Sequence, residues 1–158
     1  MIRVARAGSD VRSAPTGVSY LVGRLDRLLR RRLSEVLAPH GLSVQQYTAL
    51  AVLDSRGPLS NAQLAERSFV TPQTANEMIK AMQLRGWVER HPAPARGRAV
   101  MLQPTAAGLE LLGAAHAAAA ELEERMLAGF AARERDRLQS ELGACVHALG
   151  ALMAEGRD

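Results

Sequence analysis

The chain has 158 residues, 47% of them hydrophobic and 3% aromatic, with a formal net charge of +4 and a pI of about 10.2. This length predicts one domain, and a core of Leu, Ala, Val and Met favours helices. The sequence excludes several classes of protein. No apolar run approaches the ~18 residues of a membrane span, and a lone Cys145 excludes an internal disulfide. Residues 1–15 lack the apolar segment of a secretory signal. We expect a cytoplasmic protein with no membrane span, whose basic balance permits an anionic partner such as nucleic acid or a membrane surface.

A long amphipathic helix is predicted over residues 16–38, after an N-terminal tail over 1–15 that mixes Arg, Gly, Ser, Asp and Pro without a period. Pro39 and Gly41 end this helix. The next helix begins after Ser43 and ends before Gly57-Pro58.

Two short capped helices follow. Ser60 and Gln63 have the S-x-x-Q form of a capping box, and Thr71 followed by Pro72 combines a hydroxyl N-cap with proline at the first helical position. Two short helices joined by a turn of a few residues predict a helix-turn-helix.

A β-hairpin is predicted next, with strands at 87–90 and 98–104 around a tip rich in Pro, Gly and Arg. The tip carries Arg96 and Arg98, which would lie on phosphates or enter a minor groove of DNA. Residues 43–104 are thus expected to form a winged helix-turn-helix in a mainly α fold.

Two C-terminal helices are predicted over 105–130 and 133–153, before a tail at 154–158. The first carries one apolar stripe that extends to Phe130, and the second a heptad seam of Leu138, Leu142, Cys145, Leu149 and Leu152. These stripes are too extensive for the small lobe to cover, so residues 16–38 and 105–153 are expected to form a homodimer interface.

The second helix of the helix-turn-helix has the residue types of a DNA-reading surface. Its buried face would hold Ala75, Met78, Ile79 and Met82. The opposite face offers amides, hydroxyls and charges suited to base edges or phosphates. Glu77 would either accept a hydrogen bond from a cytosine amino group or position Arg67 or Lys80. The candidate DNA contacts are Ser60, Asn61, Thr71, Gln73, Thr74, Asn76, Glu77, Lys80, Arg96 and Arg98.

The run LSNAQLAERSFVTPQTANEMIKAMQLRGWVER, followed by RAVMLQPTAAG, resembles the MarR family of winged-helix transcriptional regulators, over roughly residues 16–153. The resemblance implies a homodimer that binds a pseudo-palindromic duplex and represses genes for efflux, stress or catabolism. It also implies a small phenolic or other anionic effector, for which Tyr20, Tyr47 and His116 are candidates. Two positions depart from the family pattern: Arg96 stands where Asp is common, and Glu77 where Arg is common.

Other readings of the sequence carry less support. Cys145 fits a buried, inert thiol better than a redox sensor, and the four histidines have no metal-ligand spacing. We find no catalytic set and no cofactor motif, so an enzyme is not expected. The alternative is a winged-helix module that docks protein instead of DNA.

Overall fold

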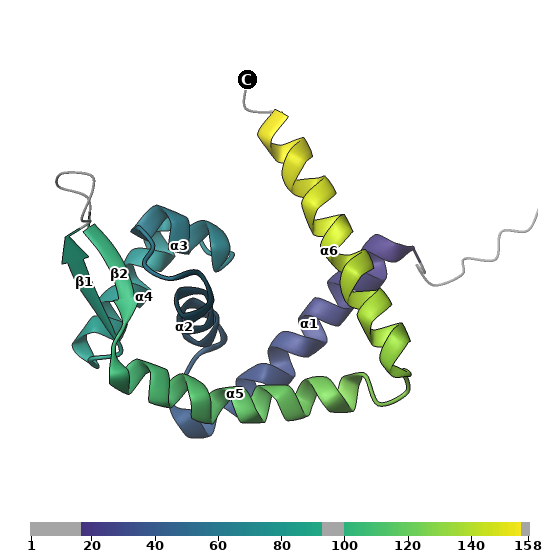
Figure 1. The fold of residues 1–158 in the computed structure, drawn as a ribbon, viewed down its shortest axis with the longest axis horizontal. Helices are drawn as coiled ribbons and strands as arrows, with labels where there is room; N and C mark the ends of the chain where they lie inside the picture. The colour runs from purple at the N-terminus through teal and green to yellow at the C-terminus, as the bar shows by residue number, and fades with distance from the viewer. Residues whose placement is uncertain (1–16, 93–99, 156–158) are drawn as a thin grey trace, which may run out of the picture.

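A computed structural model of the chain describes residues 17–92 and 100–155 (Figure 1). As the sequence predicts, the fold is mainly α with one small antiparallel hairpin. In chain order the elements are α1 (Val18–Leu37), the 3-10 helix η1 (Ala38–His40), α2 (Val44–Arg56), α3 (Asn61–Arg67), α4 (Pro72–Leu84), β1 (Val88–Pro92), β2 (Val100–Pro104), α5 (Ala106–Met126) and α6 (Ala132–Glu155).

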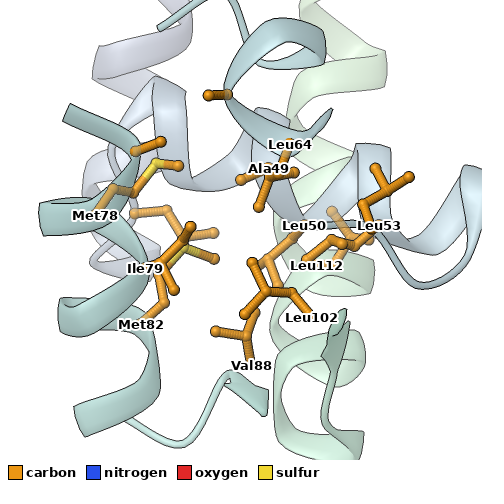
Figure 2. Close-up of a cluster of buried hydrophobic side chains, with 14 of the residues drawn as sticks. Ala49, Leu50, Leu53, Leu64, Met78, Ile79, Met82, Val88, Leu102 and Leu112 are labelled. Carbon is orange, nitrogen blue, oxygen red and sulfur yellow. The ribbon is translucent and has the colours of Figure 1, made fainter. Parts of the chain in front are cut away.

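The hydrophobic core lies where α2, α3, α4 and the hairpin meet (Figure 2). Each helix contributes the apolar side of its helical repeat, and the whole predicted buried face of α4 is buried. The largest side chains with almost no exposure are Leu37, Leu50, Leu53, Leu64, Ile79, Met82 and Leu102. This core fixes α3 and α4 relative to each other.

The hairpin is anchored to the helices through its second strand. β1 and β2 pair antiparallel with Val88 opposite Pro104 and Pro92 opposite Val100. Leu59, just before α3, bridges to Leu102 through two backbone hydrogen bonds of 3.1 and 2.8 Å. The base of the wing is therefore attached to the start of the helix-turn-helix.

The junction between the hairpin and α5 is closely packed. The Thr105 hydroxyl accepts from the Gly108 N–H at 3.1 Å and donates to the Gly86 carbonyl at 2.5 Å. A Cβ at Gly108 would lie 2.1 Å from the Trp87 carbonyl oxygen. Only glycine permits this close approach of α5 to the backbone of Trp87.

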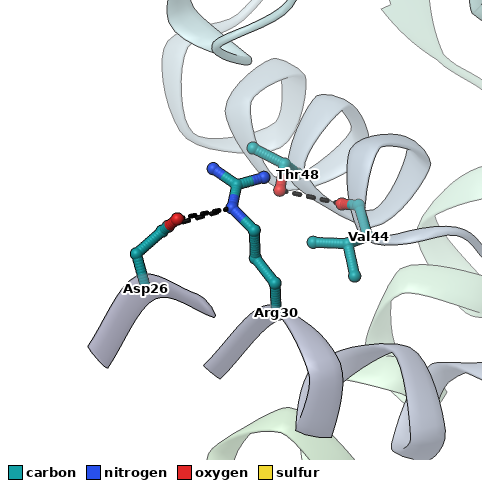
Figure 3. A network of polar contacts seen from close by, with 4 residues as sticks. All are labelled: Asp26, Arg30, Val44 and Thr48. Carbon is teal, nitrogen blue, oxygen red and sulfur yellow. Dashed lines mark hydrogen bonds and ion pairs between the residues drawn. The ribbon is translucent and has the colours of Figure 1, made fainter. Parts of the chain in front are cut away.

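Helix α5 connects the lobe to the α6 end of the molecule (Figure 1). α1 packs on α5 and α2, whereas α6 packs extensively on no other described element. On α1, Asp26 and Arg30 form an ion pair of 2.9 Å, close to the turn of α2 where the Thr48 hydroxyl donates to the Val44 carbonyl (Figure 3). Phe130 was predicted on the α5 stripe, but α5 ends at Met126 and Phe130 lies in the turn after it.

Large apolar side chains remain exposed on α1 and α6. On α1 they include Leu21, Leu25 and Leu28, and on α6 Val146 and Leu149 are 68% and 64% exposed. Among the described residues no helix combines the length and the apolarity needed to cross a membrane.

Candidate nucleic-acid interface

The N-terminus of α4 is fixed by its cap. The Thr71 hydroxyl accepts from the Thr74 N–H at 3.2 Å, and the two hydroxyl oxygens lie 2.9 Å apart. Pro72 occupies the first helical turn, where no N–H is needed. This cap defines where the helix starts, and both threonines remain exposed at that end of α4.

Four polar side chains form an exposed stripe on α4, which we call the reading face: Gln73, Asn76, Glu77 and Lys80. Their spacing of i, i+3, i+4 and i+7 places them on one side of the helix. Glu77 forms no ion pair with Arg67 or Lys80 in the described chain, so its carboxylate is not used to position either cation. The reading face combines amides, an acceptor and a cation, as base edges in a major groove require.

Helix α3 is joined to the reading face by one side chain. Ser60 and Gln63 form the predicted capping box, with the Gln63 N–H donating to the Ser60 hydroxyl at 3.3 Å. Asn61, which follows Ser60 in the chain, takes no part in the cap. Its Nδ2 lies 2.8 Å from Oδ1 of Asn76, within hydrogen-bond distance. Asn61 thereby lies beside α4, next to the reading face.

The turn between α3 and α4 holds a residue whose conformation and exposure the sequence patterns do not predict. Phe69 has φ = 56° and is 77% exposed. The turn contains no glycine, so a residue with a Cβ adopts the left-handed conformation, at a cost of about 1–2 kcal/mol. A helix-turn-helix turn without glycine is the signal that could have predicted this.

The base of the wing is organised by Glu89. Its Oε1 accepts from Gln103 Nε2 at 3.1 Å and lies 3.0 Å from Nε2 of His91. The hydrogen bond from His91 is the main cause that holds the pKa of Glu89 below its usual value, with Gln103 second. Arg90 Nε donates to Gln83 Oε1 at 3.1 Å, which ties the wing to α4. Arg96 and Arg98 lie outside the described residues.

Two of the three candidate effector residues meet. The Tyr47 hydroxyl of α2 lies 3.1 Å from Nδ1 of His116 on α5. Burial, and to a smaller extent Glu123, raises the pKa of Tyr47, so its hydroxyl stays protonated. Beside this pair is an open groove of about 650 Å³ lined by Ala51, Asp54, Ser55, Leu109, Leu112, Gly113 and His116. Tyr20 is exposed on α1 and does not line this groove.

The prediction of a buried Cys145 is wrong for the single chain. Cys145 is exposed, because α6 packs extensively on no other described element. Its thiol is covered only if another molecule covers α6.

Comparison with known proteins identifies the family of this fold. A model described as the MarR family matches residues 40–99. The HTH-type transcriptional repressor Rv2887 of Mycobacterium tuberculosis is 34% identical over 133 residues, covering 82% of this chain and 94% of the relative. The chain belongs to the MarR family. The matched MarR segment contains the whole reading face, the α3 helix and β1, the first strand of the wing.

Solved MarR structures share the architecture. The Rv2887 protein in complex with DNA superposes with a TM-score of 0.67 at 31% identity, covering 82% of this chain and 99% of that one. The same protein in complex with salicylic acid gives a TM-score of 0.69 at 29% identity, covering 84% and 98%. The wild-type MarR of E. coli, at 21% identity and a TM-score of 0.72, shows the common fold.

Proposed function

We propose that the protein is a homodimeric, sequence-specific transcriptional repressor whose DNA affinity is set by a small-molecule effector. The observation that carries this proposal is the exposed reading face of α4, which lies between a capped α3 helix and a wing. The DNA-bound structure of the Rv2887 protein supports it, because that relative has the same fold at 31% identity.

The chain has two functional parts in this role. Residues 43–104 form the DNA-binding lobe, and residues 16–38 and 105–153 form the dimerisation helices. The exposed apolar side chains of α1 and α6 support this division, because a second copy would remove them from water. Two lobes related by a two-fold axis would place their α4 helices in successive major grooves, about 34–36 Å apart.

Each candidate residue takes a role that matches its chemistry. Gln73, Asn76, Glu77 and Lys80 meet base edges, where Glu77 accepts from a cytosine amino group. Side chains at the helix starts position the protein on the sugar-phosphate backbone of DNA. The wing arginines bind phosphates or enter a minor groove, and they make the affinity for DNA salt-dependent. The residues proposed for these contacts are Ser60, Asn61, Thr71, Thr74, Arg96 and Arg98.

The effector site is placed at the groove beside Tyr47 and His116. A molecule bound there touches α2 of the DNA-binding lobe and α5 of the dimerisation helices at once. The Rv2887 complexes with salicylic acid and p-aminosalicylic acid support a small phenolic effector. Such a molecule lowers DNA affinity only as far as it binds one lobe spacing more tightly than the other.

The chain acts as a regulator rather than an enzyme, and as a DNA-binding regulator it works in the cytoplasm. Selection of bound duplexes from a random pool at two salt concentrations tests the proposal. We expect an inverted repeat with half-sites about one helical turn apart. A pool without enrichment, with binding lost at moderate salt, would contradict it and favour the protein-docking module.

A further inference from the structure

The groove between α2 and α5 has polar groups at two separate places. His116, which lines it from α5, lies 3.1 Å from the Tyr47 hydroxyl. Asp54 lines it from α2 and follows Tyr47 by seven residues, a rise of about 10 Å along the helix. The apolar part of the lining is Ala51, Leu109, Leu112 and Gly113. The groove therefore suits an elongated small molecule with an apolar middle and two polar ends.

The charge of the groove favours a cation at the Asp54 end. No arginine or lysine is among the described residues that line the groove. Asp54 is exposed and forms no ion pair with any described residue. Ser55 beside it donates to the Val52 carbonyl at 3.2 Å. A carboxylate accepts hydrogen bonds and attracts an ammonium, whereas it repels a second carboxylate.

The His116 end suits a hydroxyl group. Nδ1 of its ring meets the Tyr47 hydroxyl, and Nε2 forms no hydrogen bond with the described residues. Nε2 is a donor or an acceptor according to the tautomer of the ring. A phenolic hydroxyl both donates and accepts, so it pairs with Nε2 in either tautomer. The aromatic ring that carries this hydroxyl would cover the apolar part of the lining.

We propose that the effector of this groove is a phenolic amine, whose ammonium pairs with Asp54 and whose hydroxyl meets His116. This inference rests on the proposed function, in which the groove is the effector site, and it names the chemical class of the effector. Asp54 is the specificity-determining residue, because it favours a phenol with an ammonium over one with a carboxylate at the same place. An alkyl amine is protonated at neutral pH, as the lysine side chain is.

Calorimetric titration of the full chain with three phenols of matched length tests the proposal without DNA. Tyramine ends in an ammonium, tyrosol in a hydroxyl and p-hydroxyphenylacetate in a carboxylate. We expect tyramine to bind about tenfold more tightly than p-hydroxyphenylacetate, with tyrosol between them, as an attraction replaced by a repulsion at an exposed site predicts. Phenethylamine, which lacks the phenolic hydroxyl, should bind more weakly than tyramine.

Variants at the two ends assign the preference to its residues. Asp54→Asn removes the charge and should bring the ratio of the tyramine and p-hydroxyphenylacetate affinities toward one, and Asp54→Lys should reverse it. His116→Phe should weaken the binding of tyramine but not that of phenethylamine. Glu110→Gln is the matched control, because it removes an exposed carboxylate of α5 that does not line the groove. It should keep the wild-type ratio, and thermal unfolding verifies that each variant is folded.

The outcomes separate this inference from the function on which it rests. If the wild-type chain enriches no duplex, the proposed function fails, and an amine that binds is not an effector of DNA binding. If it enriches an inverted repeat, tyramine should lower its affinity for that duplex, and less so in the Asp54→Lys variant. Three results would overturn the inference alone: no binding of tyramine at millimolar concentration, a carboxylate that binds as tightly as the amine, or equal ratios for Asp54→Asn and Glu110→Gln.

Discussion

Helices α4 and α6 both carry an apolar stripe at helical spacing, but only the stripe of α4 is buried within the chain. On α4, Ala75 and Ile79 have no exposed surface, whereas Val146 and Leu149 of α6 are more than half exposed. The core around α4 is completed within the chain, with Leu37 of α1 and Leu112 of α5 among its members, whereas other apolar residues of α1 and α6 stay exposed. The same sequence pattern thus indicates an intramolecular core in one region and an intermolecular contact in the other.

Breaking the contact on α6 should have the largest effect. Leu149→Glu places a carboxylate in the proposed interface, where burying an unpaired charge costs several kcal/mol. We expect the dimer dissociation constant to rise about 100-fold or more, measured by sedimentation velocity, with a parallel loss of affinity for the selected duplex.

Ala144→Glu is the matched control, because it adds the same charge at an exposed position on another side of α6. It should remain dimeric. If Leu149→Glu had the same association state as Ala144→Glu, the exposed α6 stripe would not be an interface.

The junction between the two regions gives the next largest effect. Gly108→Ala would place a methyl against the Trp87 carbonyl oxygen. We expect the free energy of unfolding to fall by about 1–3 kcal/mol, measured by denaturant titration. Gly113→Ala on the same helix meets no atom within 4 Å and should be neutral or stabilising by up to ~1 kcal/mol. Equal effects of the two substitutions would show that the Trp87 contact does not hold α5.

Within the lobe, the N-cap of α4 offers a smaller effect. Thr71→Ala removes the hydroxyl that accepts from the Thr74 N–H and should destabilise the chain by about 1 kcal/mol. Thr71→Ser keeps that hydroxyl and should retain most of the stability. A Ser variant as unstable as the Ala variant in thermal unfolding would mean that the methyl group, not the cap, matters.

The smallest effect concerns pH and the base of the wing. The pKa of Glu89 is lowered in the folded chain relative to 4.5. Its ionised form therefore adds stability above about pH 4.5, and this contribution is lost as the pH falls through the lower folded pKa. Glu89→Gln should flatten the acid side of the stability–pH curve. An unchanged stability–pH curve would show that the contacts of Glu89 with His91 and Gln103 contribute nothing to the stability of the folded chain.

Local signals predicted the lobe well. The S-x-x-Q box at Ser60, the Thr71-Pro72 start and the 3.6-residue period of α4 each act within one turn of helix, and the structure confirms them. Contacts between distant positions were not predictable in this way. The Asn61–Asn76 bond depends on how two helices pack, and the Tyr47–His116 contact joins residues 69 positions apart.

The prediction for Cys145 failed for a related reason. A heptad seam indicates that a helix face is covered but not by which chain, so burial was expected where the single chain leaves the thiol exposed. The candidate DNA contacts remain predictions, and two of them, Arg96 and Arg98, lie outside the described residues.

Spacing between the half-sites tests the central claim, a dimer that reads two grooves, most directly. Insertion of about five base pairs at the centre of the selected duplex rotates one half-site by half a turn. We predict that affinity falls at least tenfold at fixed salt, while insertion of a full turn is tolerated better than the half-turn. Equal affinity for all three duplexes would contradict the account, since each lobe would then bind independently.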